Sequence, residues 1–346
     1  MTSYLENFDE NLPLSVVAEI SANHEGSIET AKKIIDLAAR SGANAVKFQT
    51  YTADSISLDS AEKDFALPSG SPWERFTSFY NLYSNSYTPR EWHKELFDHS
   101  KQLGLVPFSS PFSELDVDFL ETLECPFYKL ASPEINHLPL IRKIAETEKP
   151  ILISLGTASK SQLIKALSEF RSISQAKIVV MQCESEYPAS AINSNLIILK
   201  ELKQEFNVEI GFSDHTIGSE AAVVATAIGA KVIEKHVTLN ASNAVIDGFF
   251  SADEKTFLNY CNDIRKSEKI LGISVFRNSN EIKSNPKQRS IYPIRSLMAG
   301  EFVSEADFKI VRPGYSLSPE FFDFIIGKKI ARNIRKGERI TIEDFQ

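Results

Sequence analysis

The sequence predicts an α/β fold, a (β/α)8 TIM barrel followed by a small C-terminal domain. Short β-branched or aromatic runs alternate eight times with amphipathic stretches, a pattern typical of parallel strands joined by crossover helices. The eight units span about 250 residues, a length that favours a closed barrel; an open doubly wound sheet is the alternative. After Gly272 the alternation stops, which indicates a second domain.

The first unit shows how the elements are recognised. Residues 15–21 (SVVAEIS) are β-branched and short, and residues 27–42 carry apolar side chains at helical spacing until Gly42 ends the helix. By the same criteria further strands are expected at 45–51, 105–112, 127–134, 150–156, 177–185, 208–214 and 231–238. The matching helices are expected at 88–104, 113–124, 138–148, 159–174, 193–206, 218–229 and 253–271.

The domain boundaries follow from composition. Residues 1–272 are predicted to form the barrel, and residues 273–288, rich in Asn, Ser and Lys, a linker. Residues 289–346 are predicted to form the second domain, with short strands, two turn-like stretches (MAGE and RKGE) and a helix at 318–325. A domain of that size is marginally stable alone, so it is expected to dock on another surface.

Charge and hydropathy exclude several function classes. The formal net charge is −8 with both signs intermixed, so no basic patch indicates nucleic acid, and an anionic membrane is disfavoured. No apolar run approaches the roughly 20 residues of a membrane span, and the acidic N-terminus does not resemble a signal peptide. The three scattered cysteines are expected to be reduced thiols. We expect a soluble cytoplasmic protein.

Polar residues lie at the ends of all eight predicted strands. Strands buried on both faces should be almost continuously apolar, and TIM-barrel chemistry sits at their carboxyl ends, so these residues predict an active site. In chain order they are Glu19; Lys47, Gln49 and Tyr51; Ser109 and Ser110; Lys129, Ser132 and Glu134; Ser154; Ser185 and Tyr187; Ser213 and His215; Lys235 and His236. Two other histidines, His93 and His99, are expected on the surface of the helix at 88–104.

Two chemistries can be read from these residues. His215 and His236 end neighbouring strands about 5 Å apart, so they either chelate one cation or are loop histidines with local partners. Glu19 and Glu134 could orient a metal-bound water. The lysines and serines form a cationic, donor-rich lining suited to phosphate or carboxylate, namely Lys47, Lys129, Ser110, Ser132, Ser154 and Ser213.

Several motifs together resemble the nonulosonic acid synthases, the family of sialic, legionaminic and pseudaminic acid synthases. They are AEISANHEGSIETAKKIIDLAARSGANAVKFQTY, FSSPF, YKLASPEINHLPLI, GFSDHT and IEKH. The tail VRPGYSLSPEFFDFIIGKKIARNIRKGERIT resembles the family's antifreeze-like (SAF) domain. The segment YNLYSNSYTPREWHKELFDHSKQLGLVPFSSPF is most similar to the pseudaminic acid branch.

The resemblance implies condensation of phosphoenolpyruvate (PEP) with an open-chain N-acetylated amino sugar, releasing phosphate. It implies Mn²⁺ as the metal (Mg²⁺ or Co²⁺ as alternatives), cytoplasmic location and a domain-swapped homodimer. Carried over by motif, His215 and His236 hold the metal, and Glu19 and Glu134 are catalytic. PEP contacts match Lys47, Ser110, Lys129, Ser132, Ser154, Ser185 and Ser213, and sugar contacts match Gln49, Tyr51, Tyr187, Asp247 and, from the partner subunit, Arg312.

One loop departs from the family pattern. After the eighth strand the family carries Gly-Pro-Asp, whereas this chain has NASNAVIDGFFS, which keeps only the spacing of Asp247 and Ser251. Either the loop follows another path to the same place or the sugar pocket differs. The alternatives are therefore an acceptor such as N-acetylmannosamine or a legionaminic-route sugar and, more remotely, a non-catalytic sugar-phosphate binding protein.

Overall fold

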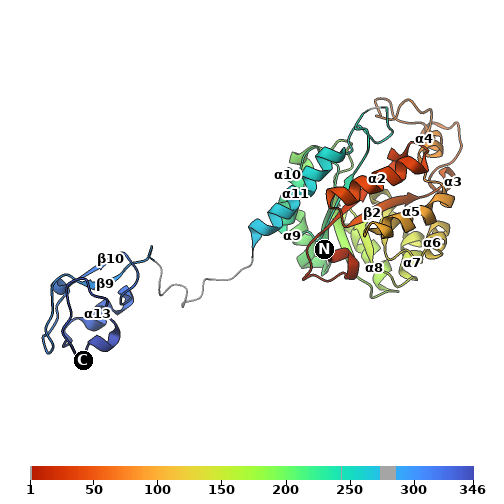
Figure 1. Ribbon diagram of the computed structural model, residues 1–346. Helices are drawn as coiled ribbons and strands as arrows, with labels where there is room; N and C mark the ends of the chain where they lie inside the picture. Colours follow the sequence, from red (N-terminus) through yellow and green to blue (C-terminus); the bar gives the residue numbers. More distant parts are fainter. Residues whose placement is uncertain (1, 243, 273–285) are drawn as a thin grey trace. The chain divides into compact units, whose positions relative to one another are not determined.

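The computed structural model describes residues 2–242, 244–272 and 286–346. The chain divides into two compact units, Met1–Gly272 and Ile273–Gln346, which are described separately below (Figure 1). Of the linker expected at 273–288, residues 273–285 lie outside the described part. In the described residues no helix is both long and apolar enough to cross a membrane.

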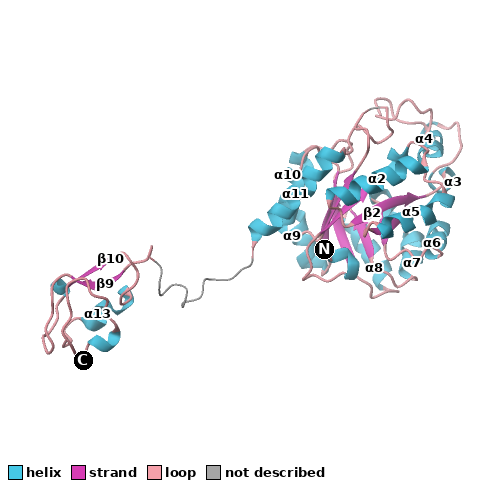
Figure 2. Cartoon of the chain, in the orientation of Figure 1, coloured by secondary structure: helices cyan, strands magenta, loops and turns pink. Residues whose placement is uncertain are grey.

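The first unit is a closed barrel of eight parallel strands, so the predicted (β/α)8 fold is confirmed. Figure 2 shows helices surrounding the strands of this unit. Each strand is hydrogen-bonded to the next, and β8 pairs with β1 to close the barrel. The strands are β1 (Ser15–Glu19), β2 (Ala45–Thr50), β3 (Val106–Pro111), β4 (Tyr128–Leu130), β5 (Ile151–Ser154), β6 (Ile178–Cys183), β7 (Glu209–Asp214) and β8 (Val232–His236).

The helices begin and end where local chemistry favours it. In α2 (Ile28–Ser41) the Ser27 hydroxyl accepts the backbone N–H of Thr30 at the start, and Gly42 takes left-handed geometry, φ 91°, at the end. The remaining crossover helices are α5 (Arg90–Gln102), α6 (Glu114–Glu121), α7 (Leu138–Ala145), α8 (Lys160–Arg171), α9 (Ile198–Phe206), α10 (Glu220–Ile228) and α11 (Glu254–Leu271). Two short helices, α3 (Ala53–Ile56) and α4 (Phe79–Ser86), lie in the long connection from β2 to α5.

The strand register decides which side chains face the barrel interior. Glu19 is paired with His236 and with Lys47, whereas Asp214 is paired with Lys235. Because side chains alternate along a strand, Glu234 and His236 point to one face and Lys235 to the other. The prediction that Lys235 belongs to the active site is therefore wrong: its ammonium bonds to Asp214 and lies over the Tyr260 ring of α11.

The second unit contains two matching halves around an apolar core. Strands β9 (Ser290–Pro293) and β10 (Phe308–Val311) are antiparallel, and η6 (Pro319–Phe321) continues into α13 (Phe322–Ile325). Leu297 in one half and Ile334 in the other exchange two backbone hydrogen bonds of 2.8 and 2.9 Å. In each half an arginine also forms ion pairs with a glutamate and an aspartate at equivalent positions. The two ionic sets are Arg295 with Glu301 and Asp307, and Arg332 with Glu338 and Asp344.

Candidate active site

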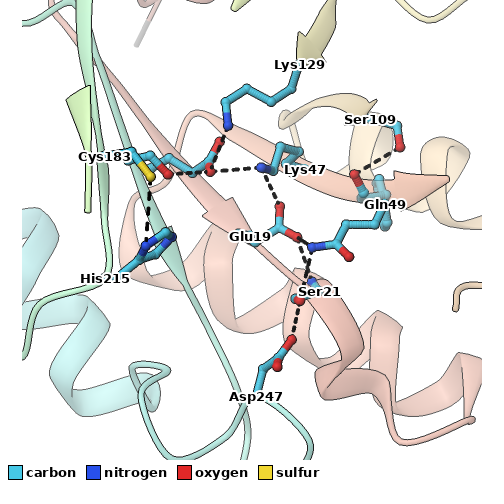
Figure 3. A network of polar contacts seen from close by, with 12 residues as sticks. Glu19, Ser21, Lys47, Gln49, Ser109, Lys129, Cys183, His215 and Asp247 are labelled. Atoms are coloured by element: carbon cyan, nitrogen blue, oxygen red, sulfur yellow. Dashed lines mark hydrogen bonds and ion pairs between the residues drawn. The ribbon is translucent and has the colours of Figure 1, made fainter. Parts of the chain in front are cut away.

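A buried carboxylate, Glu234, lies between two lysines inside the barrel. Its Oε1 is 2.8 Å from Lys47 Nζ and 3.5 Å from Lys129 Nζ (Figure 3), and it accepts the Ser213 hydroxyl at 3.0 Å. Burial opposes the negative charge, but Lys129 and Lys47 outweigh it and hold the pKa of Glu234 well below its usual range. Burial lowers the pKa of Lys129. The negative charge of Glu234 opposes this effect, and the positive charge of Lys47 adds to it. The two lysines thus share Glu234 as a carboxylate partner, and Lys47 also contacts Glu19.

Glu19 at the end of β1 is held by three neighbours. Its Oε1 accepts the backbone N–H of Ser21 at 3.0 Å and the amide of Gln49 at 3.0 Å, and its Oε2 lies 3.2 Å from Lys47 Nζ (Figure 3). Burial raises the pKa of Glu19 to about 7, and Lys47 opposes that rise. A carboxyl group with this pKa can both accept and donate a proton near neutral pH.

Three serines and a glycine form a small cradle near Lys129. A Cβ built on Gly156 would lie 2.5 Å from Ser132 Cβ, 2.6 Å from the Ser132 hydroxyl and 2.7 Å from the Ser185 hydroxyl, so only glycine lets both hydroxyls pack this closely against its backbone. The buried hydroxyl of Ser154, two residues earlier, has no hydrogen-bond partner among the described residues, and the same holds for Ser110. Unpaired buried donors of this kind need a ligand or water. The cradle suits the oxygens of an anion.

His215 and His236 lie side by side at the mouth, with ring centroids 5.3 Å apart. Nδ1 of His215 is 2.6 Å from the Glu184 carbonyl; because a carbonyl only accepts, Nδ1 carries the hydrogen and Nε2 keeps a lone pair. His236 Nδ1 is buried without a partner in the described residues. Burial lowers the pKa of both rings, so both are neutral and fit a metal ion. In the described part of the chain no group of three or more His, Cys, Asp or Glu side chains is arranged to hold a metal ion, so the two histidines stand as a pair.

Asp247 reaches the mouth from the loop after β8. Its Oδ2 accepts the hydroxyl of Ser21, which is itself bonded to Gln49 (Figure 3). Ser251 donates to the Asp247 carbonyl at 2.6 Å and accepts from Asn23 at 2.9 Å, which fixes the loop to the end of β1. The altered loop thus brings Asp247 into the polar network of Glu19.

A cavity of about 400 Å³ opens beside this network. Among the predicted sugar contacts, Gln49, Tyr51, Tyr187 and Asp247 all line it, together with His236. The Tyr187 ring lies against His215 at 4.4 Å, and the Tyr51 hydroxyl is 2.8 Å from that of Ser86. Glu134 lies next to the lining residue Pro133, and burial raises the pKa of Glu134 to about 7.

Some residues fall elsewhere or were not predicted. Arg312 lies exposed in the second unit, so the first unit's geometry does not test it. Glu234 and Ser21 were absent from the predicted site although both contact predicted members, Lys47 and Gln49. A glutamate within a barrel strand was the available signal for Glu234, because such strands are otherwise apolar.

Comparison with known proteins agrees with this geometry. Residues 34–275 match the NeuB family and residues 288–346 match the SAF domain. Pseudaminic acid synthase of Campylobacter jejuni is 38% identical over 98% of this chain and 99% of its own length. N,N'-diacetyllegionaminic acid synthase of the same organism is 31% identical over 94% of this chain and 98% of its own. The structure of N-acetylneuraminic acid synthetase from Leptospira borgpetersenii superposes with a TM-score of 0.68 at 29% identity, covering 78% of this chain and 89% of that one.

The family match covers most of the barrel, and the curated relatives match along nearly the whole chain. The resemblance inferred from the motifs is confirmed: the chain belongs to the NeuB family and carries a C-terminal SAF domain.

Proposed function

We propose that the protein condenses PEP with an open-chain N-acetylated amino sugar to give a nine-carbon nonulosonic acid and phosphate, as a pseudaminic acid synthase. The observation that carries this proposal is the adjacency of an anion cradle, a neutral histidine pair and a cavity of about 400 Å³ at one barrel mouth. The 38% identity to the Campylobacter pseudaminic acid synthase supports the choice of acceptor over the 31% legionaminic relative.

The anion cradle fits PEP. Lys47, which lies between Glu234 and Glu19, and Lys129, which approaches the same Glu234 oxygen, would bind the phosphate and carboxylate groups of PEP. Ser132, Ser154 and Ser185 would donate to phosphate oxygens, and Ser110 to the remaining polar atoms. Ser213, whose hydroxyl donates to Glu234, would contact PEP beside that carboxylate. Placing the phosphate against buried donors also stabilises it as the leaving group.

The chemistry requires one new carbon–carbon bond, one new carbon–oxygen bond from water to C2 and one broken carbon–oxygen bond to the departing phosphate. C3 of PEP attacks the aldehyde carbon, whose oxygen takes a proton, and C2 becomes an oxocarbenium centre. Water adds to C2 and loses a proton, and the tetrahedral intermediate then expels phosphate. We assign Glu19, whose pKa is near 7, to accept the water's proton, and Glu134, whose pKa is also raised to about 7, as the second catalytic carboxyl group.

His215 and His236 would hold the divalent ion, most simply Mn²⁺, with Mg²⁺ or Co²⁺ as alternatives. Bound there, the ion would act as a Lewis acid on the aldehyde oxygen. Gln49, Tyr51, Tyr187 and Asp247 would orient the sugar hydroxyl and amide groups. We further propose that Arg312 completes the sugar site of the partner subunit in a domain-swapped homodimer, in the cytoplasm.

The test is phosphate release from PEP with Mn²⁺ and each of three acceptors: 2,4-diacetamido-2,4,6-trideoxy-altrose, its legionaminic-route counterpart and N-acetylmannosamine. Release with the altrose sugar, abolished by EDTA and restored by Mn²⁺, is the expected result. Release only with another sugar would keep the reaction and change the product. A protein that binds Mn²⁺ and PEP yet releases no phosphate with any of them would contradict the proposal.

A further inference from the structure

Each of the two predicted metal ligands is preceded by a buried charged residue. Asp214 comes directly before His215 at the end of β7, and Lys235 comes directly before His236 at the end of β8. Asp214 and Lys235 are register partners in the parallel pairing of these strands, and they are 1% and 2% exposed. Because side chains alternate along a strand, the pair lies behind the histidines, on the outer face of the barrel wall.

The Asp214 carboxylate closes a turn around His215. Its Oδ1 accepts the backbone N–H of Thr216 at 2.8 Å and the Thr216 hydroxyl at 2.7 Å, so the residues before and after the histidine are tied to each other. The His215 carbonyl accepts the N–H of Ala189 at 2.9 Å, and its Nδ1 lies 2.6 Å from the Glu184 carbonyl. These bonds fix both the backbone and the ring orientation of His215.

Lys235 connects this turn to the strand that carries the second histidine. Its ammonium is 3.1 Å from Asp214 Oδ2 and also donates to the Thr216 carbonyl. The Tyr260 hydroxyl of α11 donates to the same Asp214 oxygen at 2.7 Å, and the Lys235 ammonium lies 5.1 Å from the centroid of the Tyr260 ring. Thr216 thus has its N–H, hydroxyl and carbonyl all bonded to the two charged side chains. We call Asp214, Thr216, Lys235 and Tyr260 the outer cluster.

The outer cluster lies where the pairing of the two strands ends. The register of β7 with β8 runs from Gly211 and Val232 to Asp214 and Lys235, so both histidines lie beyond its last pair. A metal ion held by two histidines from different strands binds tightly only if their spacing is fixed in advance. The outer cluster supplies an ionic link between the strands at that point.

We infer that Asp214 and Lys235 are positioning residues for the divalent ion: their ion pair fixes the spacing of His215 and His236 and thereby sets the affinity of the histidine pair for the metal. The inference rests on the part of the proposed function that places the ion at these histidines, and it adds two residues outside the site itself. Residues that orient metal ligands change metal affinity by about 10- to 100-fold when they are replaced.

The experiment measures Mn²⁺ binding to the full chain without PEP or sugar. Free Mn²⁺ gives a sharp electron paramagnetic resonance signal that decreases when the ion binds, so a titration yields the Kd. His215→Ala and His236→Ala are the references, because either change should abolish binding at the pair. The test variants are Lys235→Met, Asp214→Asn and the double variant. Asp214→Asn keeps the size of the side chain, so it tests the inference even if Lys235→Met does not fold.

Lys235→Met and Asp214→Asn should each raise the Kd for Mn²⁺ about tenfold or more. Phosphate release should need correspondingly more Mn²⁺ for half-maximal activation, while the KM for PEP at saturating Mn²⁺ stays within about twofold of wild type. The double variant should regain part of the stability lost in Lys235→Met, because no buried charge is left unpaired. It should keep the weakened Mn²⁺ binding, because the ionic link between the strands is still missing.

The matched control is Asp116→Asn. Asp116 is also a buried aspartate that forms an ion pair and closes its own turn: it lies 2.7 Å from the Arg90 guanidinium and accepts the Ser113 hydroxyl at 2.7 Å. These partners belong to the β3–α6 turn and to α5, and neither is among the predicted site residues. Asp116→Asn should lose stability and keep the wild-type Kd for Mn²⁺.

Several results would overturn the inference. They are a wild-type Kd in both Lys235→Met and Asp214→Asn, recovery of Mn²⁺ affinity together with stability in the double variant, and weakened Mn²⁺ binding in Asp116→Asn. The absence of Mn²⁺ binding by wild-type protein, or binding that survives both histidine changes, would overturn it as well. Wild-type protein that binds Mn²⁺ at the histidines but releases no phosphate with any acceptor would refute the proposed function and leave the positioning role standing.

Discussion

Lys47 and Glu234 form an ion pair of 2.8 Å in the barrel interior, and Lys129 approaches the same carboxylate oxygen from the other side at 3.5 Å. Lys47 also lies 3.2 Å from Glu19, whose pKa burial raises to about 7, so two buried cations face one carboxylate of low pKa and one carboxyl group that is partly protonated near neutral pH. A bound substrate anion would supply the missing negative charge. This arrangement links ligand binding to stability.

Glu234→Gln tests that link. Removing the carboxylate leaves Lys47 paired only with Glu19 and Lys129 without an anion, so the free energy of unfolding should fall by about 3 kcal/mol. Saturating PEP should then raise the melting temperature more in the variant than in wild-type protein. Thermal unfolding with and without PEP measures both effects. Asp98→Asn, which breaks an exposed pair with Lys94, is the control and should change stability by less than about 0.5 kcal/mol.

Gly156→Ala should block the anion cradle. The new methyl group would meet Ser132 and Ser185 hydroxyl oxygens at 2.6 and 2.7 Å, so the KM for PEP should rise at least about tenfold. The control is Gly104→Ala: Gly104 also has positive φ, 76°, but no atom within 4 Å of the added carbon. Gly104→Ala should lose about 1 kcal/mol of stability and Gly156→Ala more, because its methyl group also overlaps neighbouring side-chain atoms; only Gly156→Ala should lose PEP affinity. Equal PEP affinity in the two variants would refute the cradle.

Glu134 should make stability depend on pH. Burial raises its pKa in the folded chain to about 7 from an ordinary value of 4.5. Between these values the folded state binds more protons than the unfolded state, so this contribution is full below about pH 4.5 and is lost as pH rises through 7. Urea unfolding from pH 4.5 to 8 should show wild-type protein losing roughly 3 kcal/mol relative to Glu134→Gln. Glu146→Gln, at an exposed site, should follow the wild-type profile; parallel profiles for all three proteins would contradict the assignment.

The outward-facing pair Asp214–Lys235 should stabilise the strands that carry the two histidines. Lys235 Nζ is 3.1 Å from Asp214 Oδ2, which also accepts the Tyr260 hydroxyl at 2.7 Å. Lys235→Met leaves a buried carboxylate unpaired and should cost about 3 kcal/mol in urea unfolding. Adding Asp214→Asn should recover part of the loss, since the two residues interact directly. A purely additive double variant would argue against the pairing.

The fold was predictable because its signal is repeated. Each unit pairs an apolar strand with an amphipathic helix, and an error at one boundary does not change the alternation. Which side chains of a strand face the barrel interior was less predictable, because a shift of one residue exchanges the two faces of a strand. Lys235 was therefore assigned to the mouth, and Glu234 was missed. The register of β8 is set by its pairing with β1 and β7, and no local pattern in the sequence VIEKH encodes that pairing.

Tertiary packing explains the other errors. His93 was expected on a helix surface, but it is buried, with Nε2 2.8 Å from the Thr50 hydroxyl and Nδ1 3.0 Å from the Pro89 carbonyl. Trp73 and Phe79, which line the cavity, were not predicted because they lie in the connection from β2 to α5, whose approach to the site depends on tertiary contacts such as the bond from Trp73 Nε1 to the Ile246 carbonyl. The anion site was predictable in part, since lysines and serines at strand ends are rare as packing residues.

Gly156 contributes to the site through the atom it lacks. Its conformation, φ 54°, is one that larger residues seldom adopt, and the Ser132 side chain and the Ser185 hydroxyl pack where a Cβ would lie. The absence of a side chain at residue 156 is thus one of the features that shape this site. The spacing of the Ser132 and Ser185 hydroxyl groups therefore depends on the hydrogen that Gly156 has in place of a side chain.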